Sequence, residues 1–138
     1  MKLIWVLSPL LLFVSTACSR LSAKDVTSEH LKTIGSWTAT AQMVAESWAK
    51  GSVLQPYAKQ TLEKTQQEIA KETESLFQEL PQTRSQLAPP LQQLQQTIQQ
   101  LSIAVDQPEK TAITAPLKQL MAEEKQLQTL IQSQSKTP

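Results

Sequence analysis

Mainly apolar side chains recur in four separate stretches of the chain at intervals of four and three residues, or at their sum of seven. Because an α-helix has about 3.6 residues per turn, this spacing places each set on one helical face. The four sets are His30, Ile34, Trp37, Ala41, Val44 and Trp48; Ala58, Leu62, Thr65, Ile69, Leu76 and Leu80; Leu87, Leu91, Leu94, Ile98, Leu101 and Val105; and Ile113, Leu117, Leu120, Glu124, Leu127 and Ile131. No stretch shows the period of two that is typical of strands. The sequence therefore predicts an all-α protein.

The ends of the first two helices are predicted from capping residues and proline. Asp25 and Thr27 are both good N-caps, so the first helix is expected to begin at one of them and to run to about Lys50. The second helix is expected to begin near Pro56, which is tolerated in a first turn, and to end at Leu80.

The last two helices are harder to delimit because prolines lie within their apolar patterns. Pro89 and Pro90 predict that the third helix begins there, which leaves residues 83–90 as a turn or a short helical piece. Asp106 is the expected N-cap of the fourth helix. Pro116 predicts a kink or break in that helix near residues 114–115.

Four amphipathic segments joined by short connections indicate an antiparallel up-and-down bundle of about four helices over residues 25–133, with coiled-coil-like seams. Residues 134–138 are expected to fray. Gly35 and Ala39 form a strip of small residues that would let a neighbouring helix approach closely. Glu124 would be costly if it were buried without a partner, so it is expected at a wet end or facing His30 or a lysine.

The beginning of the chain carries a separate signal. Lys2 is followed by an apolar run over residues 3–14, then by small side chains at residues 15–17, and then by Cys18, the only cysteine. This order resembles the signal sequence and lipobox of bacterial lipoproteins, although Ser15 stands where these usually carry leucine. In that family the cysteine thiol is alkylated by diacylglycerol, and its freed amine is usually acylated, commonly with palmitate. The resemblance implies a signal peptide at residues 1–17, a lipidated Cys18 and a polar tether at residues 18–24.

Three alternatives to lipidation are weighed against it. The apolar run is shorter than the roughly 20 residues that a membrane-spanning helix needs, which disfavours an uncleaved anchor. Ordinary secretion would leave an unpaired thiol in an oxidising compartment. A nucleophilic cysteine would need a nearby base, and the single histidine, His30, gives no triad pattern.

The resemblance also implies a location. In Gram-negative lipoproteins an aspartate after the acylated cysteine favours retention in the inner membrane, and this chain has Ser19 there. The expected location is therefore the cell envelope, facing the periplasm, with the outer membrane favoured over the inner one.

The charge of the mature chain excludes some partners. Removal of residues 1–17 leaves 121 of the 138 residues and takes away Lys2, so that Lys and Arg fall from 13 to 12 and equal the 12 Asp and Glu. Neutral side chains give no counterion-release drive toward nucleic acid and no polybasic attraction to anionic lipid. The predicted partners are therefore the membrane, through the lipid, and a protein partner or a second copy, through the helical seams.

No catalytic residue, cofactor or metal ligand is predicted, because His30 has no HxxxH, CxxC or HxxE neighbour and is interpreted as structural. Trp37, Trp48 and Tyr57 are either the core of the first helix hairpin or the lining of a groove for a ligand or partner. Two functions follow. The first is a non-catalytic envelope lipoprotein that acts as a scaffold or accessory subunit. The second is a bundle that binds lipid or a small apolar ligand through these aromatic residues.

Overall fold

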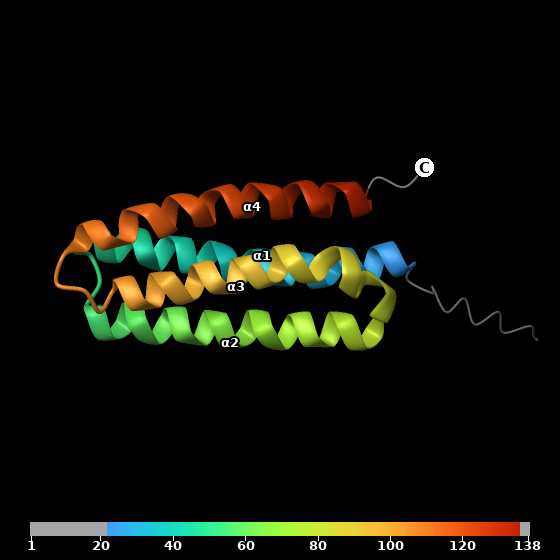
Figure 1. Ribbon diagram of the computed structural model, residues 1–138, viewed down its shortest axis with the longest axis horizontal. Helices are drawn as coiled ribbons and strands as arrows, with labels where there is room; N and C mark the ends of the chain where they lie inside the picture. The colour runs from blue at the N-terminus through green and yellow to red at the C-terminus, as the bar shows by residue number, and fades with distance from the viewer. Residues whose placement is uncertain (1–21, 136–138) are drawn as a thin grey trace, which may run out of the picture.

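The computed structural model describes residues 22–135, which fold as four α-helices and two short 3-10 segments without a strand. The elements are α1 (Ala23–Ala49), α2 (Gln55–Glu79), η1 (Pro81–Thr83), α3 (Arg84–Ala104), η2 (Lys110–Ile113) and α4 (Thr114–Ser135). Each helix packs antiparallel against the one before it, and α4 closes the ring against α1 (Figure 1). The predicted all-α up-and-down bundle is confirmed.

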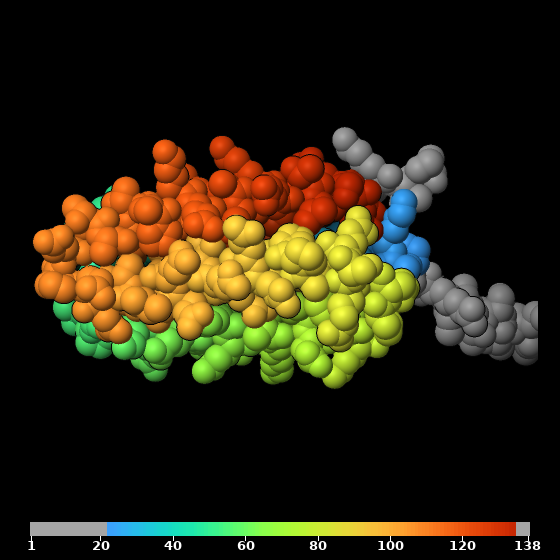
Figure 2. Space-filling view, in the orientation of Figure 1, coloured from blue at the N-terminus to red at the C-terminus, as the bar shows by residue number. Residues whose placement is uncertain are grey.

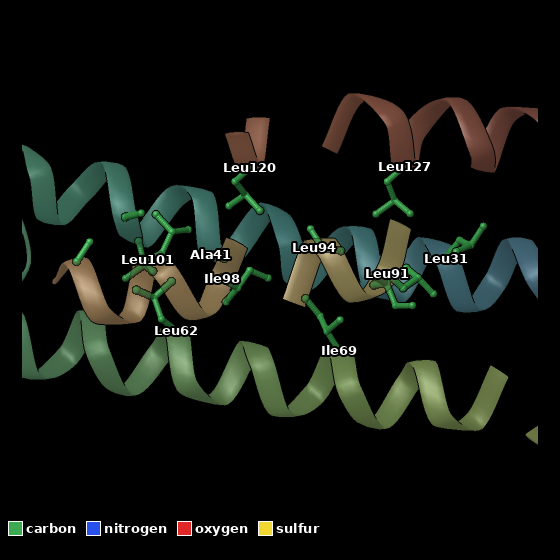
Figure 3. Close-up of a cluster of buried hydrophobic side chains, with 14 of the residues drawn as sticks. Leu31, Ala41, Leu62, Ile69, Leu91, Leu94, Ile98, Leu101, Leu120 and Leu127 are labelled. Atoms are coloured by element: carbon green, nitrogen blue, oxygen red, sulfur yellow. The ribbon is translucent and has the colours of Figure 1, made fainter. Parts of the chain in front are cut away.

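The core runs along the whole bundle and is built from the predicted seam positions (Figure 3). Members from all four helices are fully or almost fully buried: Ile34, Ala41, Leu62, Ile69, Leu91, Leu94, Ile98, Leu101, Leu120 and Leu127. The third set is buried at every position from Leu87 to Val105. Burying these leucine and isoleucine side chains, at roughly 1.5–3 kcal/mol each, is the main force that holds the helices together.

Helix α1 begins earlier than the capping residues predicted. Ser22 is the N-cap, and the backbone N–H of Asp25 donates to its hydroxyl at 3.2 Å, while the Ser22 N–H donates to the Asp25 carboxylate at 3.3 Å. Asp25 is therefore the third residue of a capping box, not the cap itself. The predicted tether was too long at its end, because Ala23 and Lys24 belong to α1.

Helix α1 ends at the predicted glycine, whereas α4 is longer than predicted. Gly51 has a φ of 75° and its N–H donates to the Trp48 carbonyl, so it ends α1 in the left-handed conformation that glycine favours. Helix α4 continues to Ser135, so the prediction that the chain frays from residue 134 was wrong for residues 134 and 135. Residues 136–138 lie outside the described residues.

Helix α3 begins at Arg84, so the predicted start at Pro89 or Pro90 was wrong. The 3-10 turn η1 leads directly into the helix, and both prolines lie inside its second turn. Their missing N–H groups leave the carbonyls of Ser85 and Gln86 without the usual partner. Both of these residues are exposed, so water can bond their carbonyls and the cost of the interruption is reduced.

Asp106 is not the N-cap of the fourth helix. Its carboxylate accepts hydrogen bonds from Gln55 at 2.6 Å and from Lys59 at 2.5 Å, which ties the end of α3 to the start of α2. The hydrogen bond from Lys59 to Asp106 raises the pKa of Lys59. The chain then forms η2, and α4 begins at Thr114 with Pro116 in its first turn, where no N–H is needed. The predicted break near residues 114–115 is the junction between η2 and α4.

Candidate functional site

His30 lies between two carboxylates of α2. Its Nδ1 is 2.6 Å from Glu72 Oε1 and its Nε2 is 2.7 Å from Glu79 Oε2, while its side chain is only 14 % exposed. Only the doubly protonated imidazolium can donate from both nitrogens. The two bonds therefore join α1 to α2 through a charged histidine.

Burial lowers the pKa of His30, but the hydrogen bonds to Glu79 and Glu72, together with their negative charges, outweigh it, so the pKa is raised. Glu79 is the last residue of α2, where the helix carbonyls already carry partial negative charge. Both the two carboxylates and the C-terminal end of α2 therefore favour a cation at this position. Within residues 22–135 no group of three or more His, Cys, Asp or Glu side chains could hold a metal ion. This arrangement is an interhelical ion pair, and it presents no free base or nucleophile.

The three aromatic residues singled out by the sequence occupy different environments. Trp48 is 5 % exposed and belongs to the core, and Lys110 Nζ lies 5.6 Å from the centre of its ring. Trp37 is half-buried against the same core. Tyr57, at the start of α2, is 57 % exposed. The first helix hairpin therefore uses the two tryptophans for packing, whereas Tyr57 faces solvent.

Several hollows lie on the side of the bundle formed by α1, η2 and α4. Three of them, with volumes of about 440, 420 and 370 Å³, succeed one another along the bundle. Met121 lines the first and second, and Glu124 and Gln128 line the second and third, so neighbouring hollows share lining residues. We call this feature the α1–α4 groove. Its lining is Lys32, Gly35, Ser36, Ala39, Gln42 and Ala49 on α1, with Lys110, Thr111, Ile113, Thr114, Leu117, Lys118, Met121, Glu124, Lys125, Gln128, Thr129 and Ile131 on η2 and α4.

The seam between α4 and α3 carries a smaller hollow. Figure 2 shows the face that α3 forms between α2 and α4, where the side chains of α3 and α4 meet. The hollow between Leu94 and Leu127 on this seam has a volume of only about 20 Å³. Thr97 also crosses the seam and donates to Glu123 at 2.8 Å. The hollow on this seam is therefore smaller than those on the α1 side, although α4 packs more extensively against α1 than against α3.

The small-residue strip explains part of this difference. A Cβ added to Gly35 would lie 3.7–3.8 Å from side chains of Leu127, Gln128 and Ile131, so α4 does pack against this glycine, as the sequence predicted. Ala39, one turn further, is exposed and lines the groove instead. The strip therefore lets α4 pack closely at Gly35, whereas it leaves Ala39 at the surface.

Glu124 lies in the groove and is half-buried. It is near the middle of α4, so it does not lie at an end of the bundle, and His30 pairs with α2 instead. The remaining expectation, a position near a lysine, agrees with Lys32, which lines the same hollow. The groove also holds Lys32, Lys110, Lys118 and Lys125, so its lining carries four positive charges and one negative charge. No spacing pattern in the sequence predicts that these residues lie near one another.

None of the helices within residues 22–135 is both long enough and apolar enough to cross a bilayer. Cys18 and residues 1–17, on which the lipidation prediction depends, lie outside the described residues. Scans of the chain against protein-family models, curated proteins and solved structures found no match. Its function therefore has to be inferred from its own residues.

Proposed function

We propose that this protein is a non-catalytic lipoprotein of the bacterial cell envelope, in which acylated Cys18 holds a four-helix bundle at a membrane surface. The bundle acts there as a scaffold or accessory subunit for a protein partner. The single observation that carries this proposal is the order of residues 2–18: a positive residue, a short apolar run, small side chains and the only cysteine.

The geometry of the bundle supports a tether at one end. The start of α1, the connection between α2 and α3, and the end of α4 lie at the same end of the bundle (Figure 1). Ser22, the cap of α1, follows Cys18 by four residues, which span at most about 14 Å when extended. Acyl chains on Cys18 would therefore keep this end close to the bilayer, with the opposite end directed into the periplasm.

The composition of the mature chain supports a lipid rather than a charge as the means of attachment. Its side chains sum to zero charge after residues 1–17 are removed, so anionic headgroups alone would not hold it. A thiol-linked diacylglycerol with an N-terminal acyl chain supplies the two or more hydrocarbon chains that stable anchoring requires. Ser19 favours the outer membrane for this anchor.

The test compares the full-length protein with its Cys18→Ser variant in a bacterial host grown with a labelled palmitate analogue. Wild-type protein should carry the label and stay with the membranes after a carbonate wash. The variant should carry none and should leave the membrane fraction. Ser15→Leu, which restores the usual lipobox residue, is the matched control and should behave as wild type. Wild-type protein without label, or a Cys18→Ser variant that stays in the membrane, would overturn the proposal.

A further inference from the structure

We propose that His30, Glu72 and Glu79, which we call the His30 cluster, form a pH-sensitive device that holds the first two turns of α1 on the bundle and thereby sets the reach of the lipid anchor. The inference rests on the proposed function, because only a chain held at a membrane by acylated Cys18 has such a reach. It adds a form of regulation to that function.

The first two turns of α1, residues 23–30, bury little apolar surface. Their buried side chains are Thr27 and Ser28, both polar, whereas Val26 is only half-buried. The Thr27 hydroxyl donates to a carbonyl of its own helix at 2.8 Å, and the Ser28 hydroxyl is buried without a hydrogen-bond partner among the described residues. Large, fully buried apolar side chains begin only with Leu31. These two turns can therefore leave the bundle without opening its core.

The His30 cluster ties this segment to α2 at the residue directly before the core begins. His30 Nδ1 lies 2.6 Å from Glu72 Oε1, and Nε2 lies 2.7 Å from Glu79 Oε2. Both hydrogen bonds cross from α1 to the C-terminal half of α2. Loss of these bonds would weaken the docking of the turns that precede Leu31 and leave the apolar contacts of the following turns in place.

The strength of this tie depends on the charge of His30. An imidazolium donates from both nitrogens, whereas a neutral imidazole donates from one and directs the lone pair of the other at a carboxylate. Burial lowers the pKa of His30, but the hydrogen bonds to Glu79 and Glu72 and their negative charges raise it above its ordinary value of 6.5. The contribution of the cluster is therefore complete below that ordinary value and is lost as the pH rises through the folded pKa.

The charges that face His30 come from α2. Residues 126–135 of α4, which pack beside the beginning of α1, contain no titratable side chain. At the start of α3, Arg84 lies over the ring of Phe77, 4.9 Å from its centre. Both ring nitrogens of His30 are taken by Glu72 and Glu79. The other charged residues within two turns of the cluster on its own two helices are Lys24, Asp25, Glu29 and Lys32 on α1 and Glu68, Lys71 and Glu74 on α2.

Release of the first two turns would change how far the bundle stands from the bilayer. Ser22 follows Cys18 by four residues, and Leu31 follows it by thirteen. Fully extended, these stretches span at most about 14 Å and about 45 Å. Because α1 begins at the tethered end of the bundle (Figure 1), a docked segment keeps that end close to the membrane. A released segment lets it stand up to about 30 Å further away.

Hydrogen exchange tests the local opening. Protein extracted in detergent from its native host is studied by quenched-flow exchange between pH 6 and pH 8.5, and each rate is divided by the intrinsic rate at that pH. Protection of the amides of residues 26–31 should fall about tenfold over this range, the order expected when charge-assisted hydrogen bonds at a partly exposed site are lost. Protection of residues 91–101 of α3 should stay the same.

Carboxamide variants test whether the cluster is the cause. Combining Glu72→Gln with Glu79→Gln should make the protection of residues 26–31 independent of pH. The matched pair Glu63→Gln and Glu74→Gln, exposed on the same helix, should leave the wild-type pH dependence intact. Circular dichroism verifies that each variant is folded. If the first pair does not fold, His30→Gln takes its place with the same expected result.

Energy transfer tests the reach. A Gln82→Cys substitution, exposed in η1 at the tethered end, supplies a single free thiol when Cys18 is acylated. The acylated protein carries a donor dye there and is placed in vesicles of phosphatidylethanolamine and phosphatidylglycerol with an acceptor in the headgroup layer. Transfer should be lower at pH 8.5 than at pH 6, and the difference should vanish when His30→Gln is added.

Four results would overturn the inference: protection of residues 26–31 that does not vary with pH, an equal loss of protection in α3, a pH dependence that survives Glu72→Gln with Glu79→Gln, or energy transfer that is the same at both pH values. Mass spectrometry of the same protein separates this inference from the proposed function. Acylated protein with pH-independent protection contradicts only the His30 cluster. Opening that varies with pH in protein without acyl chains contradicts the anchor.

Discussion

At the scale of single residues, His30 shows how a polar side chain can belong to an apolar stripe. It occupies the first position of the α1 pattern, and its ring lies at the edge of the core with each nitrogen against a carboxylate of α2. A buried neutral histidine at this position would leave one nitrogen lone pair facing an anion. The protonated form removes that repulsion and adds two charge-assisted hydrogen bonds.

These contacts predict a pH-dependent stability. The pKa of His30 is raised in the folded protein, so its stabilising contribution is complete below its unfolded pKa and is lost as the pH rises through the folded value. The difference in unfolding free energy between wild type and His30→Gln should therefore be largest at about pH 5, on the order of 1 kcal/mol, and should shrink by about pH 8. Urea unfolding of both proteins across this range measures it. A difference that does not vary with pH would show that the charge of His30 contributes nothing.

Thr65 provides a second prediction. It is completely buried in α2, and its hydroxyl has no hydrogen-bond partner among the described residues. Thr65→Val keeps the shape and removes the unpaired polar group, so it should raise the unfolding free energy by about 1 kcal/mol. Thr38→Val is the matched control, because the Thr38 hydroxyl donates to the Ile34 carbonyl at 2.8 Å and has no such penalty to lose. Equal effects of the two substitutions in thermal or urea unfolding would contradict this explanation.

The sequence predicted which residues are buried better than which residues pair. Alternation of four and three residues depends only on the helical period, and it located Leu62, Leu101 and Leu120 in the core. The partners of His30 lie 42 and 49 residues further along the chain. Which carboxylates face it depends on the rotation and offset of α2 against α1, and these are set by packing along the entire length of both helices.

At the scale of secondary-structure elements, most of the wrong predictions concern where a helix begins. Pro89 or Pro90 was expected to open the third helix, whereas α3 carries both prolines in its second turn. The first turns of a helix lose less from a missing N–H when the carbonyls concerned face water. Asp106 was also predicted wrongly from local sequence alone. Aspartate is a good N-cap residue, but this one pairs with Lys59, which is remote in the sequence.

The effect of one of the two interior prolines of α3 can be tested directly. Pro89 is exposed, so Pro89→Ala removes no packing and restores an N–H that can donate to the Ser85 carbonyl. The restored hydrogen bond should stabilise the folded protein, and the greater conformational entropy of the unfolded chain without Pro89 should destabilise it. The first effect should be larger, for a net stabilisation of about 1–2 kcal/mol. Thermal unfolding monitored by circular dichroism measures the change. A lower melting temperature would mean that the proline is needed at this position, contrary to the continuous helix described above.

At the scale of the whole molecule, the bundle is asymmetric around α4. Hollows of about 440, 420 and 370 Å³ lie on its α1 side, whereas the hollow on its α3 side has a volume of only about 20 Å³. The four amphipathic segments were enough to predict the bundle, because each must bury one face. They could not predict the groove, since the width of a seam depends on how all four helices share the core.

The central claim is that this bundle works at a membrane surface through lipid on Cys18, and the mass of the N-terminal peptide tests it most directly. Protein isolated from its native host should begin at residue 18, and mass spectrometry should find the cysteine carrying diacylglycerol with an acylated amine. An intact initiator methionine, or an unmodified Cys18 thiol on a protein released without detergent, would contradict the claim.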